Sequence, residues 1–151
     1  MAKTHEYPVS VAWEGGRGGH GEAKGEGSGT TAKIAVGKEF GGVGGGTNPE
    51  ELLAMAVASC YLMTFGIIAE NRKIPVTEMS VSAVGEVEEN GPQFTYKKIT
   101  VRSKIRLAAG ADDAQVKTAE EMAHKADNYC IITNAVRDKV TIVVEPEVIV
   151  G

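Results

Sequence analysis

Hydrophobic residues concentrate in one long stretch, NPEELLAMAVASCYLMTFGIIA, which runs from Asn48 to Ala69. Its apolar side chains follow helical spacing along one stripe and also cover most of the remaining circumference. Asn48 is a favourable N-cap, Pro49 suits the first helical position, and Glu51 stands where a capping box needs an acidic residue. The pattern therefore predicts one long helix that is apolar on nearly every face.

A helix of this kind is either a membrane span or the buried centre of a globular domain. The uncharged part, Leu52–Ala69, is about long enough to span a bilayer. However, the stretch is rich in small residues, charged residues flank both of its ends, and the chain has no second apolar run. We therefore expect a buried central helix and no membrane association.

Alternation of apolar and polar residues predicts strands in the rest of the chain. The predicted strands are Tyr7–Trp13, a short one at Lys33–Val36, Met79–Val87, Phe94–Leu107 and Val140–Val150. Asp112–Asp127 has the pattern of an amphipathic helix, and Asn128–Val136 reads as a turn-like segment. Fourteen of the 19 glycines fall between Gly15 and Gly46, where we expect mobile loops and weak edge strands.

This order of elements predicts a single α+β domain over residues 1–151. We expect antiparallel sheets wrapped around the long central helix. One chain of this size has few strands with which to cover a helix that is apolar on all sides. An intertwined homodimer, in which the second chain supplies another sheet, is therefore expected.

Charge and sequence motifs exclude several other functions. Sixteen basic and 20 acidic residues give a net charge of −4, with no basic patch for nucleic acid. Gly16, Gly18 and Gly21 match a dinucleotide-binding pattern, but no helix follows them, and GGVGGGTN lacks the Lys-Ser/Thr ending of a P-loop. The N-terminus has no apolar segment of a secretory signal. We expect a cytoplasmic protein, in which cysteines are more often free or catalytic than structural.

The chain has two cysteines, Cys60 in the apolar helix and Cys130 seventy positions later, with no redox or zinc spacing. A cysteine in an apolar helix is usually a small hydrophobic residue. A nearby arginine such as Arg17, in the glycine-flanked GGRGG loop, would instead favour the thiolate, and Glu50 could orient that arginine. Alternatively, Arg17 is a solvated loop charge and Glu50 only compensates the helix dipole.

Together these residues resemble the OsmC/Ohr family of thiol-dependent hydroperoxide reductases. NPEELLAMAVASC is similar to the family's helix signature, in which an Asn-Pro-Glu start precedes the reactive cysteine; here the Glu is Glu50 and the cysteine is Cys60. Arg17 matches an arginine after the first strand, and Cys130 matches the second cysteine. Many family members have Cys-Pro-Tyr-Ser there, whereas this chain has Cys-Ile-Ile-Thr, so the OsmC-like and Ohr-like branches both stay open.

The resemblance implies a two-cysteine peroxidase that protects against oxidative stress. The Cys60 thiolate attacks the peroxide and becomes a sulfenic acid, and Cys130 condenses with it to form a disulfide. A lipoylated protein or another thiol would reduce this disulfide, and no bound metal, haem or flavin is required. Apolar neighbours would favour organic hydroperoxides over hydrogen peroxide; these are Met55, Leu62, Met63 and Phe65.

Glu50 and Cys60 lie about 15 Å apart along one helix axis, which is far for one arginine to bridge. We therefore expect that Glu50 of the partner subunit completes the site across the dimer interface. Two other functions fit the same residues: a binding module for a lipid or other small apolar molecule, and a redox sensor that is oxidised once. Repeated peroxide turnover with a dithiol would separate the enzyme from both.

Overall fold

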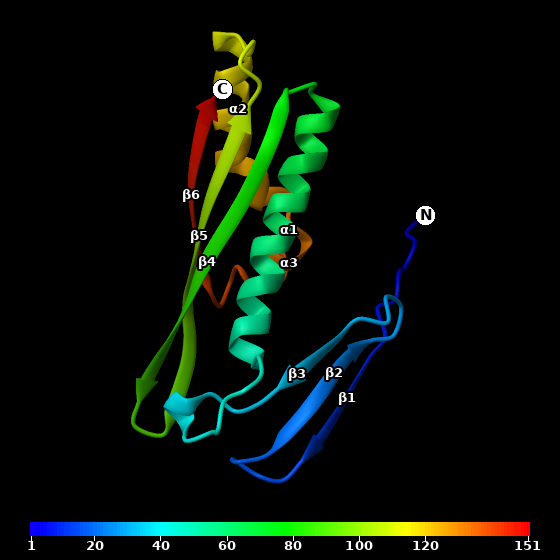
Figure 1. Cartoon of the computed structure of the whole chain (residues 1–151), viewed down its shortest axis with the longest axis vertical. Coiled ribbons are helices and arrows are strands. Elements are labelled where there is room, and N and C mark those ends of the chain that lie inside the picture. Colours follow the sequence, from blue (N-terminus) through cyan, green and yellow to red (C-terminus); the bar gives the residue numbers. More distant parts are fainter. The chain divides into compact units, whose positions relative to one another are not determined.

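The computed structural model describes every residue from Met1 to Gly151. Contacts within the chain divide it into two compact units, Met1–Leu52 and Leu53–Gly151. Each unit contains one three-stranded sheet, and the second also contains the longer helices (Figure 1). The predicted α+β class is therefore confirmed.

The first unit is an antiparallel sheet in the order β1-β2-β3, formed by β1 (Val9–Glu14), β2 (His20–Gly25) and β3 (Thr31–Ile34). A short 3-10 helix, η1 (Lys38–Phe40), follows it. The expectation of loops and weak edge strands in the glycine-rich region is wrong for β2, which is the central strand. β2 needs glycine at Gly21, because a Cβ added there would collide with the Ala12 carbonyl oxygen and lie 2.8 Å from the ring of Trp13 on β1. Glycine near the start of this strand thus makes room for the backbone and the indole of the neighbouring strand.

The second unit contains the sheet β4-β5-β6, formed by β4 (Val76–Asn90), β5 (Gln93–Leu107) and β6 (Thr141–Val150). β4 and β5 form an antiparallel hairpin, and both are longer than the strands predicted over Met79–Val87 and Phe94–Leu107. β6 lies parallel to β5, which corrects the expectation of purely antiparallel sheets. Parallel neighbours need a crossover connection, and three elements provide it: α2 (Asp113–Lys125), the 3-10 helix η2 (Ala126–Tyr129) and α3 (Ile131–Val136).

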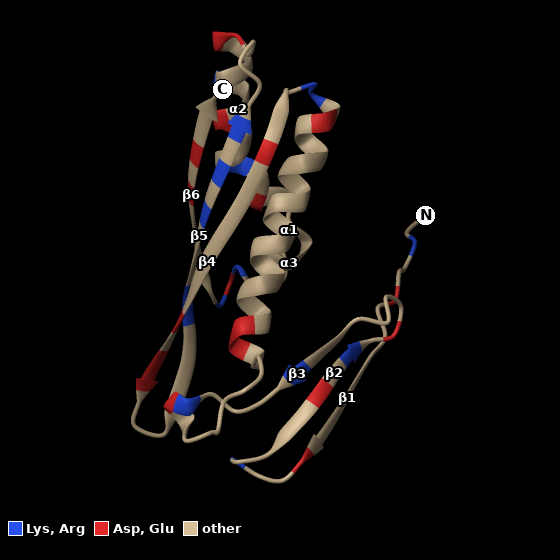
Figure 2. Ribbon diagram, in the orientation of Figure 1, with Lys and Arg blue, Asp and Glu red and all other residues tan.

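The predicted central helix is α1 (Pro49–Asn71), and its start is capped as expected. The Glu51 N–H donates to Asn48 Oδ1 at 2.8 Å. The Glu51 carboxylate accepts from the Thr47 hydroxyl at 2.7 Å. In a capping box it would instead accept from the backbone N–H of the N-cap residue, Asn48. Between acidic residues near its two ends, α1 is free of charged side chains (Figure 2).

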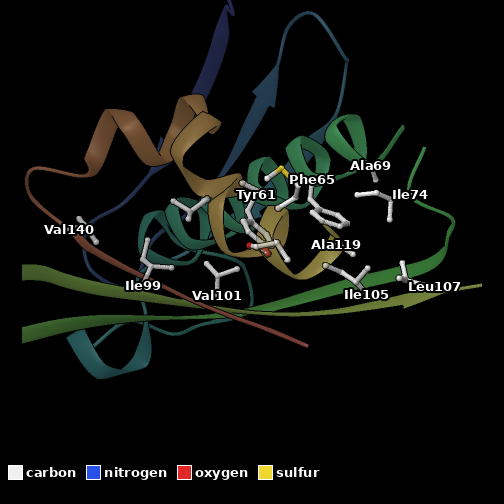
Figure 3. Packing of buried hydrophobic residues seen from close by; sticks show 14 residues of the cluster. Tyr61, Phe65, Ala69, Ile74, Ile99, Val101, Ile105, Leu107, Ala119 and Val140 are labelled. Atoms are coloured by element: carbon white, nitrogen blue, oxygen red, sulfur yellow. Dashed lines mark hydrogen bonds between the residues drawn. The ribbon is translucent and has the colours of Figure 1, made fainter. Parts of the chain in front are cut away.

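One face of α1 packs on the second sheet, and α2 covers the same side of that sheet (Figure 3). Tyr61 and Phe65 are fully buried there, against Ile105 and Leu107 of β5. Burying such a side chain contributes about 1.5–3 kcal/mol each. This packing fixes the orientation of the helix that carries Cys60.

The opposite face of α1 is exposed within the single chain. Met55, Met63 and Ile67 are 47%, 68% and 59% exposed, respectively. By length and composition alone α1 could cross a membrane, with a mean hydropathy of 2.1, and 28% of that apolar window is buried. A single chain therefore buries the predicted central helix on one side only.

Candidate functional site

The structure brings the two cysteines into contact. Cys60, half-buried in the middle of α1, hydrogen-bonds with Cys130, which lies fully buried between η2 and α3. Both thiols are free. The described residues contain no group of three or more His, Cys, Asp or Glu side chains arranged to hold a metal ion.

Cys60 is held in place through the residue that follows it. The Tyr61 hydroxyl donates to the Ala123 carbonyl of α2 at 2.7 Å. It also lies 3.2 Å from Ser103 Oγ of β5. Because a phenol has one proton, Ser103 is the donor in this second hydrogen bond. These buried contacts tie α1 to α2 and to the sheet at the level of Cys60.

Cys130 is positioned by its own backbone and by the start of α3. Its N–H donates to the Asp127 carbonyl at 3.2 Å. Its Sγ accepts from the Thr133 N–H at 3.3 Å, so the sulfur acts as the N-cap of α3. The sequence indicated only a turn-like segment here, because six residues, IITNAV, are too few to show helical periodicity.

Arg137 holds the turn that carries Cys130 through several hydrogen bonds, a role that the sequence did not reveal. Its Nη2 donates to the Asp127 carbonyl at 2.9 Å and lies 3.4 Å from the largely buried Asp127 carboxylate. Its Nε donates to Asn134 Oδ1, whose amide in turn donates to the Asn128 carbonyl at 3.0 Å. An acidic residue shortly before the cysteine and an arginine shortly after it were the only signal in the sequence.

The surroundings of Cys60 favour its thiolate. Burial raises its pKa, but hydrogen bonds from Cys130, the Ile132 N–H, the Thr64 hydroxyl and the Ile131 N–H outweigh burial, so the pKa lies below its usual value. Two of these donors are main-chain groups of α3, which no side-chain pattern in the sequence could predict. The half-exposed cysteine is thus prepared to act as a nucleophile.

Cys130 has the opposite character. Burial raises the pKa of its thiol, and the hydrogen bond and charge of Cys60 raise it further. The hydroxyl and N–H of Thr133 lower this pKa, but by less. Of the two cysteines, Cys60 is therefore the more acidic thiol, and Cys130 holds its proton more tightly.

The other predicted site residues lie in the first unit, near its glycine-rich loops. Arg17 follows β1, and its side chain lies against Gly41, where an added Cβ would come within 2.8 Å of Arg17 Cδ. Gly41 has a φ of +81°, which also favours glycine at this position. Glu50, in the first turn of α1, lines a cavity of about 280 Å³ in this unit. The roles of Arg17 and Glu50 toward Cys60 stay predictions.

The four predicted pocket residues divide into two groups. Met55 and Met63 are exposed on α1. Phe65 is fully buried in the core, and Leu62 packs against that core. We therefore assign Phe65 to the core rather than to a substrate pocket. The two methionines are the most exposed of the four, and Leu62 is partly buried.

Comparison with known proteins gives consistent matches. A family model described as OsmC-like protein matches residues 42–145. An uncharacterized protein of Bacillus subtilis is 32% identical over 151 residues, covering 100% of this chain and 99% of the relative. An organic hydroperoxide resistance protein of Xanthomonas axonopodis pv. citri is 30% identical over 140 residues, covering 90% of this chain and 91% of the relative.

A solved structure matches most of the fold. An OsmC-like protein of unknown function from Vibrio cholerae superposes with a TM-score of 0.81, covering 95% of this chain and 100% of that one. Its sequence is 21% identical, so this similarity concerns the fold alone.

Proposed function

This chain belongs to the OsmC-like family, as its sequence motifs predicted, and on that premise we propose that it is a thiol-dependent peroxidase that reduces organic hydroperoxides. The observation that carries the proposal is the cysteine pair. A half-exposed Cys60 with a lowered pKa contacts a buried Cys130 with a raised one. A nucleophile beside a protonated resolving thiol is the arrangement that a two-cysteine peroxidase requires.

The first step of the proposed reaction is attack of the Cys60 thiolate on the distal oxygen of the peroxide. The O–O bond breaks, the sulfur becomes a sulfenic acid, and the alkoxide takes a proton and leaves as an alcohol. The Cys130 sulfur then attacks the Cys60 sulfur and displaces hydroxide. The hydroxide takes the thiol proton of Cys130 and leaves as water. An external dithiol, such as a lipoylated protein, reduces the resulting disulfide by exchange.

We further propose that the working form is a homodimer in the cytoplasm. The exposed side chains of Met55, Met63 and Ile67 support this, because a second copy would remove an apolar helix face from water. At the edge of such an interface, the parts of Met55 and Met63 that the second copy leaves uncovered would contact the apolar part of an organic hydroperoxide. Sedimentation at micromolar concentration is expected to give a dimer, and a stable monomer would contradict the assembly.

Arg17 and Glu50 complete the proposed mechanism. Arg17 would stabilise the Cys60 thiolate, and Glu50 of the partner subunit would orient Arg17. Mixing Cys60→Ser and Glu50→Ala chains tests a shared site, because the heterodimer then has one site with both native residues and is expected to recover activity. A site within one subunit predicts no recovery.

The enzyme itself is tested by steady-state peroxide consumption. The fully reduced chain is supplied with tert-butyl hydroperoxide or hydrogen peroxide, and with dihydrolipoamide or thioredoxin as reductant. We expect repeated turnover, faster with the organic peroxide, no turnover in Cys60→Ser, and a single turnover in Cys130→Ser. A binding module would consume no peroxide, and a sensor would stop after one equivalent with the dithiol present.

A further inference from the structure

Thr133 presents a buried polar atom that the fold itself does not use. The residue is fully buried, and its hydroxyl is the one buried side-chain nitrogen or oxygen without a hydrogen-bond partner. A buried hydroxyl without a partner destabilises a fold and calls for an explanation. Valine has nearly the same shape without the hydroxyl, and it would fill this position without the cost of an unpaired polar atom.

The position of Thr133 relative to Cys130 indicates what the hydroxyl is for. The Thr133 N–H already donates to Cys130 Sγ at 3.3 Å. The hydroxyl of the same residue is close enough to lower the pKa of Cys130, although it lacks the geometry of a complete hydrogen bond in the reduced protein. In this state Cys130 is a neutral thiol that hydrogen-bonds with Cys60, so its sulfur has little need of a second donor.

We propose that Thr133 is a catalytic residue of the resolving step, in which its hydroxyl donates to Cys130 Sγ while that sulfur carries negative charge. The inference rests on the proposed peroxidase function. When Cys130 attacks the Cys60 sulfenic acid, the S–S bond forms and the S–O bond breaks. The Cys130 proton and the departing hydroxide leave as water. A donor that pairs fully only with the charged sulfur stabilises the transition state more than the ground state.

The same hydroxyl acts in the reverse direction during reduction. A dithiol that attacks Cys60 of the disulfide displaces Cys130 as a thiolate. The better the charge on the leaving sulfur is stabilised, the faster exchange proceeds. Thr133 therefore assists Cys130 both as an attacking and as a leaving group.

The first test measures the thiolate of Cys130 without any peroxide. In the Cys60→Ser variant Cys130 is the only cysteine, so its thiolate absorbance can be titrated against a Cys60→Ser/Cys130→Ser chain that supplies the tyrosine background. Thr133→Val is expected to move this titration to higher pH, and Thr133→Ser is expected to leave it in place. An unchanged titration in Thr133→Val overturns the proposal, whether or not the protein is a peroxidase.

The second test separates the two chemical steps after one equivalent of tert-butyl hydroperoxide. Sulfenic acid formation is followed by dimedone labelling of Cys60, and disulfide formation by the loss of both free thiols. Thr133→Val is expected to slow disulfide formation about tenfold, the effect of one hydrogen bond to a charged group, and to leave sulfenic acid formation unchanged. Thr133→Ser is expected to restore the second step.

Matched controls distinguish a chemical role from a structural one. Thr118→Val makes the same substitution in α2, where the hydroxyl donates to the Ala114 carbonyl of its own helix, and is expected to change neither step. Equal slowing of both steps in Thr133→Val would indicate distorted packing and overturn the proposal. If the wild-type chain forms no sulfenic acid, the peroxidase function fails, whereas the titration still decides the role of Thr133.

Discussion

Replacing Tyr61 by phenylalanine removes one oxygen atom from the core beside Cys60. This atom donates to the Ala123 carbonyl at 2.7 Å and accepts from the Ser103 hydroxyl 3.2 Å away. Both partner residues are buried, at 0% and 2% exposure, so water cannot replace the lost contacts. Leaving a buried polar group unpaired costs about 1–3 kcal/mol. Because the two partners can adjust in part, we expect the free energy of unfolding to fall by about 2 kcal/mol.

The effect also depends on pH. Burial raises the pKa of Tyr61, the Asp127 charge adds to this, and the Ser103 hydrogen bond opposes it. The unfolded chain loses the phenolic proton from about pH 10, whereas the folded chain retains it. The stability contributed by the neutral hydroxyl is therefore complete below about pH 10 and is lost as pH rises through the folded pKa. The slope reaches at most about 1.4 kcal/mol per pH unit.

Urea denaturation at fixed protein concentration measures both effects. At neutral pH, Tyr61→Phe is expected to lower the urea midpoint without changing the m-value. Above about pH 10 the difference from wild type should narrow, because only the wild type loses the Tyr61 contribution. Tyr7→Phe is the control, since Tyr7 is 84% exposed and its substitution should change stability by less than about 0.5 kcal/mol. A Tyr61→Phe curve that matches this control would show that the hydroxyl contributes nothing to stability, and a stability difference that stays constant with pH would show that its raised pKa does not.

Three further substitutions test the cysteine pair. Arg137→Gln loosens the turn that holds Cys130, so it is expected to slow disulfide formation on the order of tenfold and to change sulfenic acid formation little. Arg102→Gln is the control, because it removes an exposed ion pair and should change neither rate. Cys130→Ala is expected to raise the pKa of Cys60 and shift its alkylation to higher pH, whereas Cys130→Ser keeps a donor and should shift it less. If the two variants have identical alkylation profiles, the Cys130 hydrogen bond does not lower the pKa of Cys60. Ile131→Pro is expected to shift the alkylation of Cys60 in the same direction as Cys130→Ala.

Patterns of hydrophobicity predicted the long elements well, because each has many residues that repeat one period. The helix predicted over Asn48–Ala69 is α1, Pro49–Asn71, and the hairpin strands were found with shorter boundaries than β4 and β5 have. β2 was missed because propensity ranks glycine low in strands, while the cross-strand position of Trp13 requires it at Gly21. Contacts between strands override local preference there.

The site was predicted unevenly for a similar reason. The sequence singled out Cys60 and Cys130, which the structure brings into contact, because thiol chemistry belongs to a particular side chain. The donors that set their pKa values include main-chain N–H groups of α3 and the hydroxyls of Thr64 and Thr133. Main-chain groups are present at every residue except proline, so their orientation is known only from the folded backbone.

Ile131 shows how a departure from the common Cys-Pro-Tyr-Ser pattern can change the reactive cysteine. It is the first residue of α3, where proline is tolerated, and Cys130 before it has the extended backbone (φ −81°, ψ 118°) that a following proline favours. The fold would therefore accept proline at this position. However, proline has no N–H, and the Ile131 N–H is one of the donors that lower the pKa of Cys60.

Ile131→Pro therefore removes one donor from the Cys60 thiolate while keeping the backbone of α3. We expect the pKa of Cys60 to rise, so its alkylation by iodoacetamide, measured against pH in the Cys130→Ser background, should shift to higher pH. Ile131→Ala keeps the N–H and removes only an exposed side chain, so its profile should match that of Cys130→Ser alone. Equal profiles for the proline and alanine variants would show that this main-chain group does not act on the thiolate.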